Sequence, residues 1–551
     1  MQGRSNRGEL ITRESVAATN QSFYSLTNNK QFRRFQFEST LNYDRVFGTN
    51  HRVGGLAYFN LSDQQATDQN SDDENKDMSL SYAMIPKRYM RMTGRVAYGY
   101  KDTYMIDFNF GYTGTENFMP GRQFGFFPSI AVGWIPTSYN WAEEHASWLS
   151  FLKFRASYGT VGNDRIGGQR FPYLNWVQTG RSSLWGASSQ VETVNILRVG
   201  ADNLVWEKAL KANFGVDGHL FNNAGSFTVD FFRDTRKGIF QKRVQVPGYV
   251  GLINMPYGNV GSMVSWGSDG NASYTFNLTK DVNVTLRGNY TYSTNKVLNY
   301  EKTYETYPYK EYTGLPNEIT YGYQCIGFFK DEADVLYSPK QSWGTVMPGD
   351  LKYKDMNGDG VIDDEDRVPI AYKTMFPMLV YGFGGQINYK QLSVGFLFKG
   401  TGKVDYFRNN TGYIPFNEGE MGNILVQFQD PSTRWIPRWY AAEHGIDVSL
   451  AENQNAQLPR LQYGANTNNR QLSDFWKGDA RYLRLQEVTV NYNLKNDFLK
   501  KANIASVDIQ LVGNNLYVWD KVKVFDPEQA NKVGTVYPIP SVYSLQLYIN
   551  F

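Results

Sequence analysis

The residues best suited to chemistry in this 551-residue chain form an acidic loop, from residue 355 to residue 366. Oxygen donors recur at positions 1, 3, 5, 7, 9 and 12 of this loop, and a glycine stands at position 6. Hard oxygen ligands at this spacing can wrap one Ca²⁺ ion, so the pattern predicts a calcium loop. The predicted ligands are Asp355, Asn357, Asp359, Val361 through its backbone carbonyl, Asp363 and Asp366.

Two features of the same loop favour a plain surface turn. Position 12 carries Asp366 in place of the usual bidentate glutamate, and no helical pattern flanks the loop. An Asp- and Gly-rich turn that stays solvated has the same composition. Calcium is therefore expected as a structural ion or not at all, and no other cofactor is indicated.

Tryptophans in long polar segments are the second group with a possible binding role. Indole rings stack on sugar rings and pack against partner proteins, because they present a large, rigid apolar surface. Loop hydrophobes also hold their own loops together, which is the alternative. The candidate ligand or partner contacts are Trp176, Trp185, Trp343, Trp435 and Trp439.

Enzymatic chemistry has no support in the sequence. The four histidines, His51, His145, His219 and His444, are scattered and lack metal-ligand spacing with acidic residues or with Cys325. No nucleophile elbow and no phosphate-binding loop occurs. The chain is therefore not expected to be an enzyme. Its near-neutral formal charge of +3 gives no reason to expect nucleic-acid binding.

The elements that must position these residues are strands, because apolar residues recur with a period of two. Between residues 282 and 294, Val284, Leu286 and Tyr290 share one face, and Arg287 lies on the other. A shift of apolar phase near 486–487 predicts a β-bulge. Sixteen strands are predicted, near residues 9–19, 33–46, 51–60, 88–100, 103–113, 124–135, 147–159, 206–220, 225–236, 264–279, 282–294, 379–389, 391–400, 480–494, 505–516 and 541–551.

Short and long connections alternate between these strands. The predicted short turns lie at 47–50, 101–102, 221–224, 280–281 and 390. The long polar connections lie at 61–87, 160–205, 295–378, 401–479 and 517–540. Short periplasmic turns and long extracellular loops are typical of a transmembrane antiparallel β-barrel of the outer membrane. The sequence therefore predicts an all-β membrane barrel, with the C-terminus on the short-turn side.

The last strand carries a predicted barrel-assembly signal. Its apolar positions alternate up to the terminal aromatic residue, so its hydrophobic face ends at the expected periplasmic interface. An ordinary final strand that happens to end in phenylalanine is the alternative. The residues concerned are Tyr543, Leu545, Leu547, Ile549 and Phe551.

Several segments go beyond a generic barrel pattern and resemble the SusC/RagA type of TonB-dependent outer-membrane transporter. One is 203–208, which contains Trp206, Glu207 and Lys208, followed by 213–217 and 220–223. Further matching segments occur in family order at 152–163, 254–261, 349–360, 474–476, 482–485, 513–516 and 525–528. The resemblance runs from about residue 33 to Phe551.

The resemblance implies a larger assembly than this chain. Members of that family form a barrel of about 22 strands with an N-terminal plug. They import large glycans or peptides with a SusD-like lid lipoprotein, and the TonB complex supplies energy. The sixteen strands would then be the C-terminal part of such a barrel, with residues 1–551 as one partial barrel domain whose plug and signal peptide are missing. The expected location is the outer membrane of a Bacteroidetes-like Gram-negative cell.

Two other functions remain open at this stage. An even number of strands and a periplasmic C-terminus also fit a self-contained sixteen-stranded diffusion porin. A surface barrel or adhesin without transport is the third reading. The identity of the ligand, an oligosaccharide or a peptide, is encoded by no motif.

Overall fold

The structure is a computed structural model. It describes residues 32–66, 86–166, 170–185, 189–252, 254–302, 305–373, 376–408, 412–416, 424–464, 466–501, 503–532 and 536–551. Within these ranges, the longest α-helices have six residues, and no helix is long and apolar enough to cross a membrane.

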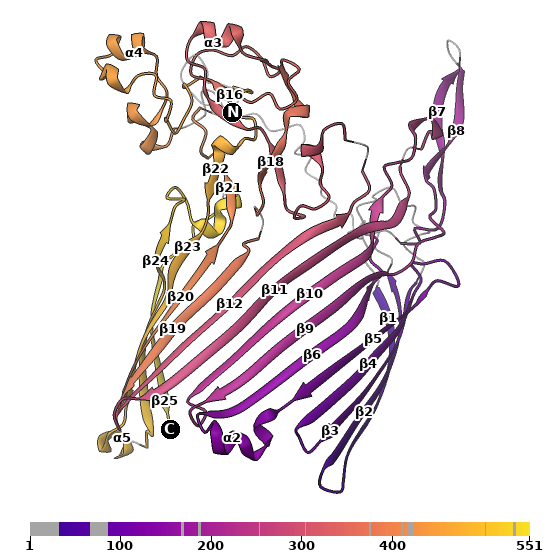
Figure 1. The fold of residues 1–551 in the computed structure, drawn as a ribbon, viewed down its shortest axis with the longest axis vertical. Helices are drawn as coiled ribbons and strands as arrows, with labels where there is room; N and C mark the ends of the chain where they lie inside the picture. Colours follow the sequence, from indigo (N-terminus) through magenta and orange to yellow (C-terminus); the bar gives the residue numbers. More distant parts are fainter. Residues whose placement is uncertain are drawn as a thin grey trace, which may run out of the picture.

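One antiparallel sheet of fifteen strands dominates the molecule (Figure 1). Its strands follow chain order, so each pairs with its neighbours in sequence among the sheet strands. They are β1 (Phe32–Phe47), β2 (His51–Ala66), β3 (Lys87–Tyr100), β4 (Tyr104–Thr115), β5 (Phe124–Trp134), β6 (Leu149–Asn163), β9 (Glu207–Leu220), β10 (Gly225–Lys242), β11 (Tyr257–Asn277), β12 (Val282–Asn299), β19 (Leu379–Tyr389), β20 (Leu392–Gly402), β23 (Tyr482–Leu494), β24 (Ser506–Asp520) and β25 (Val542–Asn550).

Fifteen of the sixteen predicted strands are thus confirmed, in the predicted order. The predicted strand at 9–19 lies outside the described residues. Among the described residues, β1 and β25 are the two edge strands of the sheet. The fold is that of a large antiparallel membrane-barrel sheet, as the alternation predicted.

Each strand presents an apolar face and a polar face, and the cross-strand register keeps these faces continuous. On the apolar side, Met92 pairs with Tyr112, and Tyr112 pairs with Phe126. At the other edge, Leu511 pairs with Leu545 on the same side. All five side chains are exposed. A slip of one residue would exchange the two faces, so the alternation of side chains specifies the register.

Tight turns close the strands at one end of the sheet. Lys101 and Asp102 both have positive φ angles, 51° and 50°, as the two-residue turns that match strand twist require. Lys390 also has a positive φ angle. The predicted bulge is confirmed as a register shift between Leu485 and Glu487.

The long connections gather at the opposite end of the sheet, at the top of Figure 1, whereas the C-terminus lies with the short turns. They contain elements that the alternation did not predict. These are the β7–β8 hairpin (Trp176–Trp185, Ser189–Arg198), β13 (Thr320–Gly322), β14 (Cys325–Phe328), α3 (Glu332–Tyr337), β15 (Lys340–Gln341), β16 (Leu351–Tyr353), β17 (Val361–Ile362), β18 (Val368–Ala371), β21 (Asp405–Phe407), α4 (Arg438–Glu443) and β22 (Lys477–Asp479). Two short helices, α2 (Asn140–His145) and α5 (Asp497–Lys501), lie at the short-turn end.

Two of the long connections share a hydrophobic core, which we call the loop cluster. It joins the β12–β19 connection to the β20–β23 connection. Its buried members are Tyr323, Phe328, Leu351, Tyr353, Ile362, Tyr413, Phe428, Trp435, Ala456, Leu458 and Trp476. The loops at this end are therefore packed structures with their own interior.

Candidate ligand-binding site on the polar face of the sheet

The polar face of the sheet carries ion pairs in place of an apolar core. On β6, the guanidinium of Arg155 lies 2.9 Å from an oxygen of Asp217 and 2.7 Å from an oxygen of Asp230. On β3, Arg95 pairs with Asp107 of β4. Charged residues on one face and exposed apolar residues on the other are the pattern of a water-filled lumen opposite a lipid-facing surface.

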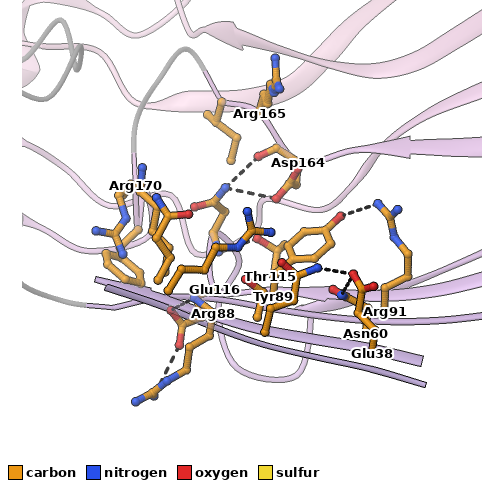
Figure 2. A pocket seen from close by; sticks show the side chains of 18 of the residues that line it. Glu38, Asn60, Arg88, Tyr89, Arg91, Thr115, Glu116, Asp164, Arg165 and Arg170 are labelled. Atoms are coloured by element: carbon orange, nitrogen blue, oxygen red, sulfur yellow. Dashed lines mark hydrogen bonds and ion pairs between the residues drawn. The ribbon is translucent and has the colours of Figure 1, made fainter. Parts of the chain in front are cut away.

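A cavity of about 680 Å³ opens on this polar face, at the loop end of β1–β4 (Figure 2). Its volume falls within the range of small-molecule sites, about 300–1,000 Å³. The strands supply Arg34, Gln36, Glu38, Tyr58, Asn60, Ser62, Gln64, Lys87, Arg88, Tyr89, Arg91 and Thr115. The connections supply Glu116, Asn117, Asp164, Arg165, Ile166, Arg170 and Phe171.

Basic groups outnumber acidic groups in this cavity, by six residues to three. The acidic side chains all have partners within the protein. Glu38 accepts a hydrogen bond from Asn60 at 3.0 Å, and Glu116 lies 3.8 Å from a guanidinium nitrogen of Arg88. Asp164 accepts hydrogen bonds from the Asn117 amide through its backbone and carboxylate oxygens. The cavity is therefore electropositive.

The motif around Trp206 supports the wall of this cavity from behind. The Trp206 ring is buried against Phe118 and Phe127, and its indole N–H donates to the carbonyl of Gln123 at 3.1 Å. These contacts connect the start of β9 to β5 and to the turn after β4. The motif thus has a structural role.

The next two residues of the motif differ in burial. Glu207 is buried and accepts a hydrogen bond from the Asn163 amide at 3.2 Å, at the end of β6. Asn163 in turn accepts from the backbone N–H of Arg165, which lines the cavity. Lys208 is exposed. A short chain of hydrogen bonds therefore connects the motif to the cavity wall.

In the predicted calcium loop, the side-chain oxygens bind the loop's own backbone. Asp355 accepts from the N–H groups of Gly358 and Gly360, at 2.6 and 2.9 Å. Asp366 is fully buried and accepts from the N–H groups of Met356 and Asp363, at 2.7 and 2.9 Å. These contacts hold the loop in a compact turn.

The remaining predicted calcium ligands lie in the same turn. Asn357, Asp359 and Asp363 each accept the N–H of the residue two positions later. Val361 begins β17 and is exposed. The part of the chain that the structure describes holds no group of three or more His, Cys, Asp or Glu side chains gathered as for a metal ion. Calcium binding stays a prediction.

The five candidate tryptophans have different environments. Trp435 is only 3% exposed inside the loop cluster, so its predicted contact with a ligand or partner is wrong: packing has removed the ring from the surface. Trp343 packs edge-on against Tyr323 at the side of the same cluster. Trp439 on α4 is 66% exposed, and Trp176 is half-buried. Trp185 ends β7, and its side chain lies outside the described residues.

The single cysteine belongs to the loop cluster and carries no reactive thiol. Burial raises the pKa of the Cys325 thiol to about 12, and nearby Asp474 adds to the shift. A thiol with so high a pKa stays protonated at neutral pH, so Cys325 acts as a packing residue.

The last strand keeps the predicted alternation. Tyr543, Leu545, Leu547 and Ile549 lie on the exposed apolar face of β25, and Phe551 follows the strand with 89% of its surface exposed. This placement fits a hydrophobic end strand. Its reading by assembly machinery stays a prediction.

Comparison with known proteins gives one consistent answer. The chain is 24% identical over 554 residues to TonB-dependent receptor P26 of Formosa agariphila, covering 93% of this chain and 53% of that protein. It is 23% identical to TonB-dependent receptor SusC of Bacteroides thetaiotaomicron, covering 83% of this chain and 43% of SusC. The resemblance to SusC/RagA-type receptors is confirmed. The chain spans about half the length of these relatives.

Solved structures agree on the SusC/RagA-type fold. A structure of the RagAB peptide transporter matches with a TM-score of 0.68 at 21% identity, over 95% of this chain and 56% of that one. The "open-open" state of the RagAB peptide importer matches with a TM-score of 0.69 at 22% identity, over 95% and 55%. No family model matches the chain.

The cavity itself was missed by the sequence reasoning. Its residues come from four strands and two connections, and no two of its basic groups form a recognisable motif. The basic residues of 33–46 and 88–100 give no one-sided signal, because Arg34 and Arg91 lie on the cavity face whereas Arg33 and Arg45 lie on the opposite face. Only the register shows which of them meet.

Proposed function

We propose that this chain forms part of the barrel of an outer-membrane, TonB-dependent importer of a large nutrient. The fifteen-stranded sheet carries the proposal, because it has an exposed apolar face, a polar face with ion pairs, and its longest loops gathered at one end. The similarity to SusC and to TonB-dependent receptor P26 supports the coupling to TonB.

The proposed partners follow from the same resemblance. A SusD-like lipoprotein would cover the loop end, and the TonB complex would act on a plug domain of the SusC/RagA type. The barrel-assembly machinery would read the strand that ends at Phe551. The nutrient would be an oligosaccharide or a peptide, held between the loops and the lid before it crosses the outer membrane of a Bacteroidetes-like cell.

Growth on single nutrients tests this function. Strains lacking the gene, and strains lacking TonB, are grown on a panel of glycans and peptides as sole carbon source. We expect both strains to lose growth on the same nutrient, with recovery when the intact gene is restored. A nutrient lost with the gene but not with TonB would indicate a diffusion porin. Loss of surface attachment with no nutrient defect would indicate an adhesin.

We also propose that the loop 355–366 binds Ca²⁺. Its oxygens already lie in a compact turn. Tyr309 lies beside this turn, where burial and then the negative charge of Asp366 raise the pKa of Tyr309 to about 12. Calorimetric titration should show calcium binding that Asp359→Ala abolishes. Asp364→Ala is the matched control, since this exposed carboxylate is outside the ligand positions. Absence of heat at about millimolar Ca²⁺ would contradict the proposal.

A further inference from the structure

We propose that the cavity at the loop end of β1–β4 binds an acidic oligosaccharide, with carboxylate or sulfate groups facing Arg34, Lys87 and Arg165. This inference rests on the proposed uptake function and names the chemical class of its substrate. Three features of the cavity support it: its surplus of positive charge, the alignment of its cations across neighbouring strands, and the types of side chain that line it.

The first argument is the surplus of positive charge. Within the described residues, no acidic side chain lies within ion-pair distance of Arg34, Lys87 or Arg165, which all line the cavity and are exposed. In contrast, Arg88 contacts Asp63 at 3.1 Å and Glu116 at 3.8 Å. Among the described residues, these three cations are therefore the ones that an anionic ligand can approach without displacing a carboxylate.

The second argument is their position in the sheet. Arg34 of β1 lies opposite Gln64 of β2, and Gln64 lies opposite Lys87 of β3. The two cations thus lie on the same face, in one row across three strands, about 10 Å apart at the backbone. Repulsion between exposed like charges at this distance is largely screened, so the row costs the sheet little and leaves both cations available to an anion. The row suits a chain that carries repeated acidic groups.

The third argument favours a sugar over a peptide. The cavity presents side-chain amides and hydroxyls in the same space as aromatic rings, and these groups suit sugar hydroxyls and sugar faces respectively. Gln36, Asn60, Gln64 and Asn117 supply the amides, and Tyr58 and Tyr89 lie among them. Ile166 is the only aliphatic hydrophobic residue that lines it among the described residues, and it is buried. The described lining residues therefore form no aliphatic subsite for peptide side chains.

The test is binding to the purified protein in detergent, measured by calorimetry at low ionic strength. The probes are a galacturonate trisaccharide, a sulfated galactose trisaccharide, a neutral galactose trisaccharide and a tetraglutamate peptide. We expect the acidic sugars to bind at least about tenfold more tightly than the neutral sugar, and added salt to reduce that difference. The carboxylated and sulfated arms distinguish which acidic group the cavity prefers.

Variants locate the binding. Arg34→Gln combined with Lys87→Gln should weaken acidic-sugar binding by about tenfold or more and leave neutral-sugar binding unchanged. The matched control is Arg33→Gln, because Arg33 occupies the adjacent position of β1 on the opposite face. Both cations are exposed strand residues, so the double variant is expected to fold; its heat-dependent mobility on a gel verifies this.

The outcomes separate this inference from the proposed function. Equal affinity for acidic and neutral sugars, or unchanged binding in the double variant, would overturn the acidic-sugar assignment. Tetraglutamate binding as tight as the acidic sugars would overturn the choice of a sugar. Either result leaves the proposed function standing if the deletion strains still lose growth on one nutrient. If the strains that lack the gene or TonB grow normally on every nutrient, the uptake function itself is refuted.

Discussion

Replacing Asp350 with alanine is expected to destabilise the loop cluster by about 3–5 kcal/mol. The Asp350 carboxylate is fully buried and forms an ion pair with Arg460, at 2.7 Å. It also accepts hydrogen bonds from the amides of Asn466 and Asn469 and from the backbone N–H of Met347. Alanine would leave the half-buried guanidinium of Arg460 and three further donors without their acceptor.

The effect of Asp350→Ala should be local, because the sheet does not depend on this network. Limited proteolysis and hydrogen exchange of 323–373 and 424–476 should show a loosened loop cluster, while the fifteen strands remain protected. Glu332→Ala is the control, since this exposed carboxylate lies on α3 in the same connection. If Asp350→Ala resists protease as well as the control does, the buried network does not hold the cluster together.

Placing an arginine at Leu511 is expected to lower the stability of the folded protein in the membrane by about 2–4 kcal/mol. Leu511 lies on β24, on the exposed apolar face, with Val490 and Leu545 as its cross-strand partners. A charge at this position would face hydrocarbon if the apolar face contacts lipid. Denaturant unfolding in outer-membrane vesicles measures the loss.

The neighbouring residue supplies the matched control for Leu511→Arg. Gln510 occupies the polar face, opposite Asn491 and Gln546, so Gln510→Arg should change stability by less than about 1 kcal/mol. The two variants add the same side chain one residue apart on one strand. Equal stability of the two would contradict the assignment of the apolar face to the lipid.

Asp350→Ala and Leu511→Arg probe two parts of the protein that are stabilised in different ways. The sheet is held by a backbone ladder and by the contrast between its two faces, whereas the loop end is held by a buried core and a charged network. The electropositive cavity lies at the loop end of β1–β4, and none of its described lining residues belongs to the loop cluster. The pairing of β1–β4 sets the positions of its strand residues. Hydrogen bonds from Arg165 to Asn163 and from Asn163 to Glu207 connect its wall at 164–165 to β9.

The sheet could be predicted from the sequence because its signals are local. Alternation along residues such as Val284 and Leu286 specifies a strand and its two faces, and short turns such as Lys101–Asp102 leave little freedom in pairing. The same alternation located the bulge near Glu487, because an extra residue shifts the apolar phase. The order of fifteen strands then followed from connecting neighbours.

The loops and the cavity were decided only by the tertiary structure, since their contacts join segments far apart in the chain. Trp435 and Trp439 look alike in sequence, yet one is buried in the loop cluster and the other is exposed on α4. Asp350 and Arg460 form their ion pair although 110 positions separate them in the sequence. Arg34 and Arg165, which line the same cavity, are still farther apart in the sequence. The alternation of apolar and polar residues by itself determined a sheet with one apolar and one polar face, because strand periodicity is a local property of the sequence. Only the folded chain determined which charges face one another in its lumen, because that depends on register and on loop packing.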